Sequence, residues 1–289
     1  MTNEPALRQS TVAIDGERIS YSTAGEGTAI LLLHGWPQTS HAWRGVTPQL
    51  ARNYCVVAPD LPGMGRSSKL RQNFQKTAIA DVMATFMAQF GHDQFIVVGH
   101  DMGGQVAYPL AARHRSAVCG LVFIESGLPG FGQEKAMDVG NGGSWHFGFN
   151  MAGDISEALV SGKEEIFLDF ILLRDRIGVL SEAAISESDF AHYVRAMRRP
   201  GALRCMFGYY RALLDDAKDN RQLGEAPLDC PVMAVSADQG YVGGAERTMR
   251  QVAKQVMSCT IANSGHYLPE EQPVALAKAI HEFIVTERL

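Results

Sequence analysis

One short stretch, Val97-Val98-Gly99-His100-Asp101-Met102-Gly103-Gly104, constrains the fold of this chain more than any other. It has the pattern of an apolar strand that ends in a sharp turn and opens a helix. Such a turn strains the backbone at its central residue, and only glycine-sized neighbours fit two positions to either side. Gly99 and Gly103 hold those two positions around Asp101. The stretch therefore predicts a nucleophile elbow with Asp101 at its tip.

An aspartate at the elbow indicates a particular chemistry. Serine acyl transfer is excluded, because the elbow residue is not a serine. A carboxylate held there can attack an electrophilic carbon and leave a covalent ester, which a histidine-activated water then cleaves. Taken alone, the stretch would favour an ordinary strand-to-helix turn with Asp101 as the helix cap. Other motifs of the chain favour the elbow.

The apolar runs predict an α/β protein with a mostly parallel central sheet flanked by helices. Val12-Ala13-Ile14 and Ile19-Ser20-Tyr21 flank Asp15-Gly16, which indicates an antiparallel hairpin at the start of the sheet. Further strands are expected over residues 29–33, 54–58, 95–98, 118–124, 231–236 and 256–261, and helices over 75–90, 102–113, 244–254 and 274–285.

A long helical segment interrupts this alternation. Residues 149–217 have helical periodicities and no convincing strand. We expect this segment to follow the sixth strand as an insertion above the carboxyl ends of the strands, where ligands bind in open α/β sheets. The chain then divides into a core of residues 1–126 and 221–289 and a helical cap of residues 127–220.

Length and composition exclude several classes of partner. A chain of 289 residues with 46% hydrophobic residues fits one large α/β domain with an insert. The net charge of −5 and the scattered basic residues argue against nucleic acid or an anionic membrane as partner. The first ten residues lack the apolar region of a signal peptide, and no apolar run approaches the ~18 residues of a membrane span, so a cytoplasmic protein is expected. The five cysteines have no metal-ligand spacing, and neither a metal nor a cofactor is expected.

Four motifs, taken in their order, resemble the α/β-hydrolase superfamily, and specifically its aspartate-nucleophile branch of epoxide hydrolases and dehalogenases. They are His34-Gly35-Trp36-Pro37, the run from Asp60 to Ser67, the Asp101 elbow, and Ser264-Gly265-His266 before the last helix. In such enzymes the catalytic residues follow the order nucleophile, acid, histidine. The resemblance covers the whole chain and implies that His266 is the general base, a task that suits an imidazole because its pKa lies near working pH.

The resemblance leaves two candidates for the acid that orients His266. Many relatives place it after the strand at 231–236, but Asp238 lies about two residues before the matching position, which is Gly240. A minority place it after the strand that follows the nucleophile helix, where this chain has Glu125. Glu125 is therefore favoured over Asp238.

The resemblance also implies residues that hold the reacting oxygens. The backbone N–H groups of Trp36 and Met102 would form the oxyanion hole. Opening an epoxide leaves an alkoxide, a poor leaving group that needs a proton donor, and Tyr210 with His146 could supply it from the cap. A cap histidine, a cap tyrosine and a glutamate acid together resemble bacterial epoxide hydrolases of the cystic fibrosis transmembrane regulator inhibitory factor type. The histidines at 41, 92, 114, 192 and 281 are expected on the surface without a role.

These expectations favour a cofactor-free epoxide hydrolase that converts a small neutral epoxide to a vicinal diol, as a monomer or homodimer. One alternative is a haloalkane dehalogenase or a haloacid dehalogenase of the fluoroacetate type. The fluoroacetate enzymes clamp the substrate carboxylate with arginines one and four residues after the nucleophile and have a tryptophan after the cap histidine; these positions are Met102, Gln105 and Phe147 here. A carboxylate buried without cationic partners is costly. A second alternative is a ligand-binding protein without turnover on the same scaffold.

Overall fold

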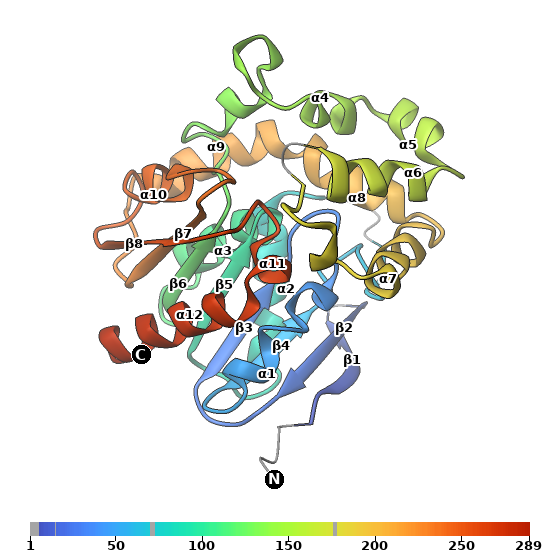
Figure 1. Ribbon diagram of the computed structural model, residues 1–289. Helices are drawn as coiled ribbons and strands as arrows, with labels where there is room; N and C mark the ends of the chain where they lie inside the picture. The colour runs from blue at the N-terminus through green and yellow to red at the C-terminus, as the bar shows by residue number, and fades with distance from the viewer. Residues whose placement is uncertain (1–5, 15, 70–72, 176–177) are drawn as a thin grey trace.

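A twisted, mostly parallel sheet forms the centre of the protein. The computed structural model describes residues 6–14, 16–69, 73–175 and 178–289, and within them the sheet has eight strands in the order β1-β2-β4-β3-β5-β6-β7-β8 (Figure 1). β1 pairs antiparallel with β2 and β2 antiparallel with β4, and the remaining neighbours are parallel. The strands are β1 Arg8–Ile14, β2 Glu17–Ala24, β3 Ala29–Leu33, β4 Cys55–Pro59, β5 Phe95–His100, β6 Val118–Ile124, β7 Val232–Ala237 and β8 Val256–Ile261.

The predicted hairpin and strands are present, with small shifts at their ends. Ile14 pairs with Glu17, so two residues connect β1 to β2. Gly16 has the positive φ of 82° that such a turn requires, whereas Asp15 lies outside the described residues. The strand before Asp101, β5, continues past its predicted end at residue 98 to His100, because Gly99 and His100 still pair with β6.

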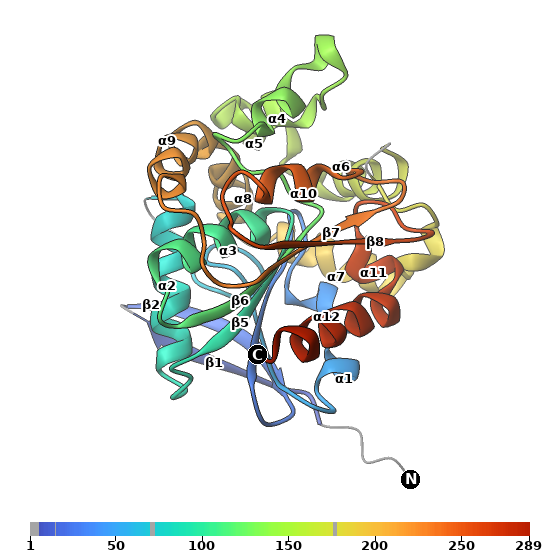
Figure 2. The same cartoon turned by 90° about the vertical axis from the view of Figure 1, so that its left-hand side faces the viewer.

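Helices cover both faces of the sheet. In the edge-on view of Figure 2, α2 and α3 lie on one side of the strands and α12 on the other. Every residue of β3 is buried, as expected for a strand covered on both faces. Its side chains alternate, with Leu31 and Leu33 in one apolar cluster and Ile30 and Leu32 in the other. The helices of this core are α1 Thr47–Leu50, α2 Lys76–Ala88, α3 Met102–Arg113, α10 Gly244–Met249, α11 Leu268–Glu271 and α12 Pro273–Glu287, with the 3₁₀ turn η1 Ser40–Trp43.

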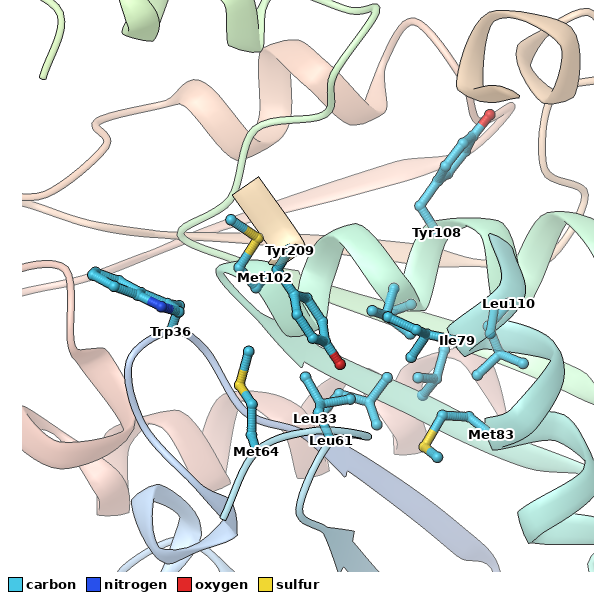
Figure 3. Close-up of a cluster of buried hydrophobic side chains, with 14 of the residues drawn as sticks. Leu33, Trp36, Leu61, Met64, Ile79, Met83, Met102, Tyr108, Leu110 and Tyr209 are labelled. Carbon is cyan, nitrogen blue, oxygen red and sulfur yellow. The ribbon is translucent and has the colours of Figure 1, made fainter. Parts of the chain in front are cut away.

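The apolar cluster on the α2 and α3 side reaches the end of the sheet where the nucleophile lies. Figure 3 shows it extending from Met83 and Leu110 to Met102 and Trp36. All four side chains are at most 3% exposed. Trp36 and Met102, which the sequence predicts at the functional site, are thus packed into the main apolar core.

The segment between β6 and β7 consists of helices and turns and gathers over one end of the sheet (Figures 1 and 2). Its elements are η2 Gln133–Met137, η3 Val139–Asn141, α4 His146–Met151, α5 Asp154–Val160, α6 Glu164–Asp169, the π-helical turn η4 Phe170–Arg174, η5 Glu182–Ala184, α7 Glu187–Met197, α8 Ala202–Arg211 and α9 Leu213–Gly224. The helical insertion after the sixth strand is therefore present, while its limits at residues 127 and 220 stay a prediction.

One predicted helix is shorter than expected. The helix expected over residues 244–254 ends at Met249. The backbone that follows pairs with a distant residue instead, since Leu228 donates to the Val252 carbonyl and accepts from the Lys254 N–H. Within the described residues, no helix combines the length and apolar character needed to cross a membrane.

Candidate active site

Asp101 lies at the tip of a strained turn between β5 and α3. Its φ of 51° and ψ of −118° fall outside the regions that residues with side chains prefer. The two glycines are required: a Cβ at Gly99 would lie 2.4 Å from the Gly103 carbonyl oxygen, and a Cβ at Gly103 would lie 2.2 Å from the Leu33 carbonyl oxygen. The Asp101 side chain makes no capping hydrogen bond to α3, so the helix-cap interpretation is wrong. Its Oδ1 instead accepts from the backbone N–H of Trp36 at 2.8 Å.

His266 lies between two carboxylates. Its Nε2 is 3.6 Å from Asp101 Oδ2, and its Nδ1 is 3.4 Å from Glu125 Oε2. Burial alone would lower the pKa of His266, but Asp101 and then Glu125 outweigh burial and raise this pKa to about 10. Burial favours the neutral form of Asp101, but the contact with His266 lowers its pKa below the usual value. The resting site therefore holds an imidazolium beside an ionised aspartate.

Glu125 extends from the end of β6 beneath His266. Its side chain is buried, and its two oxygens accept hydrogen bonds from the backbone N–H groups of Ala237 and Tyr241, both at 2.7 Å. A carboxylate held at both oxygens has a fixed orientation. The structure thus brings Glu125 to the Nδ1 side of the imidazole.

Asp238, the other candidate acid, does not approach His266. It is exposed, and its carboxylate accepts from the backbone N–H groups of Asn263 at 2.9 Å and Ser264 at 3.0 Å. These bonds lower the pKa of Asp238. Asp238 therefore braces the loop that carries His266 without contacting the imidazole.

Two backbone groups flank the Asp101 carboxylate. The Trp36 N–H already donates to it, and Trp36 follows β3 in the loop predicted for the oxyanion hole. Met102 is the first residue of α3, where backbone N–H groups have no partner within the helix. Both residues thus adjoin Asp101, and their role as an oxyanion hole stays a prediction.

Tyr210 and His146 extend from the helical insertion toward Trp36. Tyr210 belongs to α8, and its ring centroid lies 5.0 Å from that of Trp36 and 5.6 Å from that of His146 on α4. Burial, and then the charge of Asp101, raises the pKa of Tyr210 well above its usual value, so its hydroxyl keeps its proton. Burial lowers the pKa of His146 to about 4, which leaves that imidazole neutral. Its Nδ1 lies 2.6 Å from the Ser144 hydroxyl.

Two further residues at the site were not foreseen from the sequence. His100, directly before the nucleophile, is fully buried, and its Nε2 lies 2.8 Å from the His266 carbonyl oxygen, which ties the loop of the base to the nucleophile strand. Asn150, one turn after His146 on α4, is fully buried with its amide beside the Tyr210 side chain. His100 lies inside the elbow motif, and the helical spacing of Asn150 from His146 was the available signal. Among the described residues, no group of histidines, cysteines and carboxylates could hold a metal ion.

Comparison with known proteins identifies the family of the fold. Residues 28–273 match the family model described as alpha/beta hydrolase fold. The chain is 34% identical to the soluble epoxide hydrolase of Corynebacterium sp. strain C12, over 90% of this chain and 91% of that protein. It is 27% identical to the fluoroacetate dehalogenase of Burkholderia sp., over 93% of this chain and 91% of that protein. The crystal structure of wild-type Cfl2 from Burkholderia cenocepacia superposes with a TM-score of 0.89 at 34% identity, covering 98% of this chain and 97% of that chain.

Proposed function

The chain belongs to the alpha/beta hydrolase fold family and is a hydrolase, and on that premise we propose that it opens small neutral epoxides to vicinal diols through an ester on Asp101. The observation that carries the proposal is the difference in protonation across the site. Asp101 is ionised beside His266, while Tyr210 on the insertion remains protonated. A nucleophile and a proton donor are both needed to open an epoxide.

In the first step, a carboxylate oxygen of Asp101 attacks one epoxide carbon. The carbon–oxygen bond breaks, its electron pair stays on the epoxide oxygen, and Tyr210 gives that oxygen a proton while the neutral His146 donates a hydrogen bond to it. The product is a hydroxyalkyl ester of Asp101. Both donors are buried next to Trp36, so little water competes for the developing alkoxide.

Esterification removes the charge of Asp101, the larger of the two carboxylate influences that raise the pKa of His266, so the imidazolium gives up a proton, which restores the one that Tyr210 donated. In the second step, the neutral His266 takes a proton from water as the water oxygen attacks the ester carbonyl. The tetrahedral intermediate then collapses: the acyl carbon–oxygen bond breaks, the His266 imidazolium protonates the departing diol oxygen, and the new Asp101 carboxyl returns a proton to His266. Glu125 stabilises the imidazolium that forms again, and the N–H groups of Trp36 and Met102 stabilise the oxyanion.

The fluoroacetate-type alternative is disfavoured by the residues next to the nucleophile. Met102 and Gln105, one and four positions after Asp101, are both buried and neutral. A substrate carboxylate there would lose its hydration without gaining a cationic partner. A neutral epoxide carries no such cost.

Product analysis with styrene oxide, an aliphatic epoxide and fluoroacetate, side by side, tests this choice. We expect diols from the epoxides and no fluoride from fluoroacetate. In ¹⁸O water, a single turnover should place unlabelled Asp101 oxygen in the diol. Fluoride release without diol would replace the proposal by a dehalogenase, and an ester that forms without hydrolysis would indicate a protein without turnover.

We also propose that residues 127–220 act as a cap that carries Tyr210 and His146, and that the enzyme works in the cytoplasm without a cofactor, as a monomer or homodimer. The contacts of Tyr210 with Trp36 support the first of these points, since they join the insertion to the loop after β3. Cell fractionation tests the cellular location, sedimentation of the purified protein tests the oligomeric state, and turnover by extensively dialysed protein tests the independence from a cofactor.

A further inference from the structure

A cavity of about 570 Å³ lies apart from the site described above. Its walls come from β2, the loop that follows β4, the turn η1, and α7 of the insertion. Figure 1 shows α7 on the side of the molecule where β2 and β1 form the sheet edge. None of the residues assigned a role in ester formation or hydrolysis lines it.

The described residues that line this cavity carry an excess of positive charge. Four are arginines, Arg44, Arg66, Arg195 and Arg199, and the single carboxylate is Asp60. Arg44 is paired with Asp189 at 2.8 Å and with Glu270, so its positive charge is balanced by two carboxylates that do not line the cavity.

Asp60 does not balance the other three arginines. It is buried, and three donors already satisfy its carboxylate: the Ser40 N–H at 2.9 Å, the Ser40 hydroxyl at 2.7 Å and the Arg66 N–H at 2.7 Å. The guanidinium of Arg199 donates to the Gly65 carbonyl, which is neutral. Arg66 and Arg195 have exposed side chains at the rim. The cavity therefore offers guanidinium groups whose charge no lining carboxylate takes up.

A pair of stacked histidines forms part of the wall, and the ring centroids of His41 and His192 lie 4.3 Å apart. Burial, and then His41, Arg195 and Arg66, lower the pKa of His192 to about 4 against the opposing influence of Asp60. His192 is therefore neutral, and the arginines beside it give this part of the cavity a positive potential, which favours an anion.

The lining is also partly apolar. Leu7, which is half exposed, and Tyr21 of β2 both line the cavity. Guanidinium groups match carboxylates and phosphates in geometry, and an apolar wall suits a hydrocarbon body.

From the cavity, its unbalanced arginines and its apolar wall, we propose that this is a second binding site, separate from the catalytic one, for a small organic anion: a carboxylate or phosphate monoester with an apolar body. Arg66 and Arg195 bind the anionic group, with Arg199 behind them, and Leu7 and Tyr21 contact the body.

Isothermal titration calorimetry on the full chain tests the proposal, with benzoate and phenyl phosphate as anions and benzyl alcohol as the neutral probe. The wild type should bind at least one of the anions and bind benzyl alcohol far more weakly. The variant Arg66→Gln/Arg195→Gln should bind the anion roughly 100-fold more weakly, since it loses two charge-assisted contacts. Arg66→Lys/Arg195→Lys should keep part of the affinity, because it keeps both charges.

Arg250→Gln is the matched control, because Arg250 is an exposed arginine that pairs with Glu246 and does not line the cavity. It should bind the anion like the wild type. Epoxide turnover of the double variant should equal that of the wild type, which separates this site from the catalytic one. Circular dichroism checks that each variant is folded.

Three results would overturn the proposal. The first is that the wild type binds neither anion at millimolar concentration. The second is that Arg66→Gln/Arg195→Gln binds the anion as tightly as the wild type does. The third is that the wild type binds benzyl alcohol as tightly as it binds the anion. Competition between the anion and the epoxide with unchanged affinity in the double variant would place the ligand at Asp101 and would also overturn it.

Discussion

The carboxylate of Glu125 fills the space that a side chain at Gly240 would need. A Cβ at position 240 would lie 2.3 Å from Oε2 of Glu125, closer than any van der Waals contact permits. Gly240 follows β7, at the position where the sequence resemblance would place an orienting acid. An acid at one of these positions therefore excludes an undisturbed acid at the other.

This relationship predicts that Gly240→Ala disturbs catalysis although position 240 has no chemistry of its own. The added methyl group should push Glu125 away from His266, slow hydrolysis of the ester, and lower the free energy of unfolding by about 1–3 kcal/mol through overpacking. The double variant Glu125→Ala/Gly240→Asp should be more active than Glu125→Ala alone. Gly148→Ala is the control, because a Cβ there meets no atom within 4 Å. Normal ester hydrolysis in Gly240→Ala would contradict the steric argument.

Glu125→Gln and Asp238→Asn form a matched pair of nearly isosteric changes. Loss of the orienting carboxylate of a serine triad costs roughly 10⁴ in turnover, so we expect Glu125→Gln to depress ester hydrolysis by about 10²–10⁴ and ester formation much less. Asp238→Asn should be mild, because Asp238 contacts only the backbone of residues 263 and 264. Rapid-quench measurement of ester formation and of ester hydrolysis in each variant shows which carboxylate orients His266. A severe loss in Asp238→Asn with near-normal Glu125→Gln would reverse the assignment.

Replacing His266 by Gln should trap the ester. Alkylation needs only Asp101 and a proton donor, whereas hydrolysis needs the base, so turnover should fall by about 10²–10⁴ while the adduct accumulates. Mass spectrometry should find Asp101 heavier by the mass of one epoxide. The control Asp101→Asn/His266→Gln should stay unmodified. Unmodified His266→Gln protein after prolonged incubation would count against the two-step mechanism.

Tyr210→Phe should slow ester formation by about 10²–10⁴, because it removes a general acid. His146 should substitute in part, so the further change His146→Phe should lower the rate again. Tyr209→Phe is the matched control: its hydroxyl donates to the Pro62 carbonyl at 2.8 Å, and its loss should cost about 1 kcal/mol of stability with ester formation unchanged. Unchanged epoxide rates in Tyr210→Phe would remove Tyr210 from the first step.

The raised pKa of His266 predicts a pH dependence that depends on Asp101. In the folded wild type the imidazole should titrate near pH 10, and in Asp101→Asn at a clearly lower pH, because the negative charge that favours the protonated form is gone. This pKa lies above the value of 6.5 in the unfolded chain, so protonated His266 stabilises the folded state. Its contribution to the free energy of unfolding is fully present below pH 6.5 and is lost as the pH rises through about 10. Imidazole proton resonances and urea unfolding at several pH values measure both effects. An unchanged His266 titration in Asp101→Asn would contradict the ion pair.

Much of the fold follows from local patterns. The Gly99, Asp101 and Gly103 spacing predicts the elbow, and the requirement at Gly99 is local, because a Cβ there would meet the Gly103 carbonyl. The requirement at Gly103 comes instead from the Leu33 carbonyl on the neighbouring strand β3. The continuous apolar run of residues 29–33 specifies a strand buried on both faces, since no other strand environment accepts it. The early end of α10 could not be read from its own residues, because the pairing that ends it comes from Leu228, far away in the chain.

The sequence by itself determined the elements, their order, and a short set of residues able to form a site: an aspartate at the elbow, a histidine before the last helix, and two candidate acids. Only the tertiary structure decided that Glu125 reaches His266, that His100 holds the carbonyl of that residue, and that His41 stacks on His192 beside the arginine-lined cavity. The physical reason is the separation along the chain over which each kind of interaction acts. Backbone sterics and apolar periodicity act between residues close in the chain, whereas the approach of groups more than a hundred residues apart depends on how the strands pair and the helices pack.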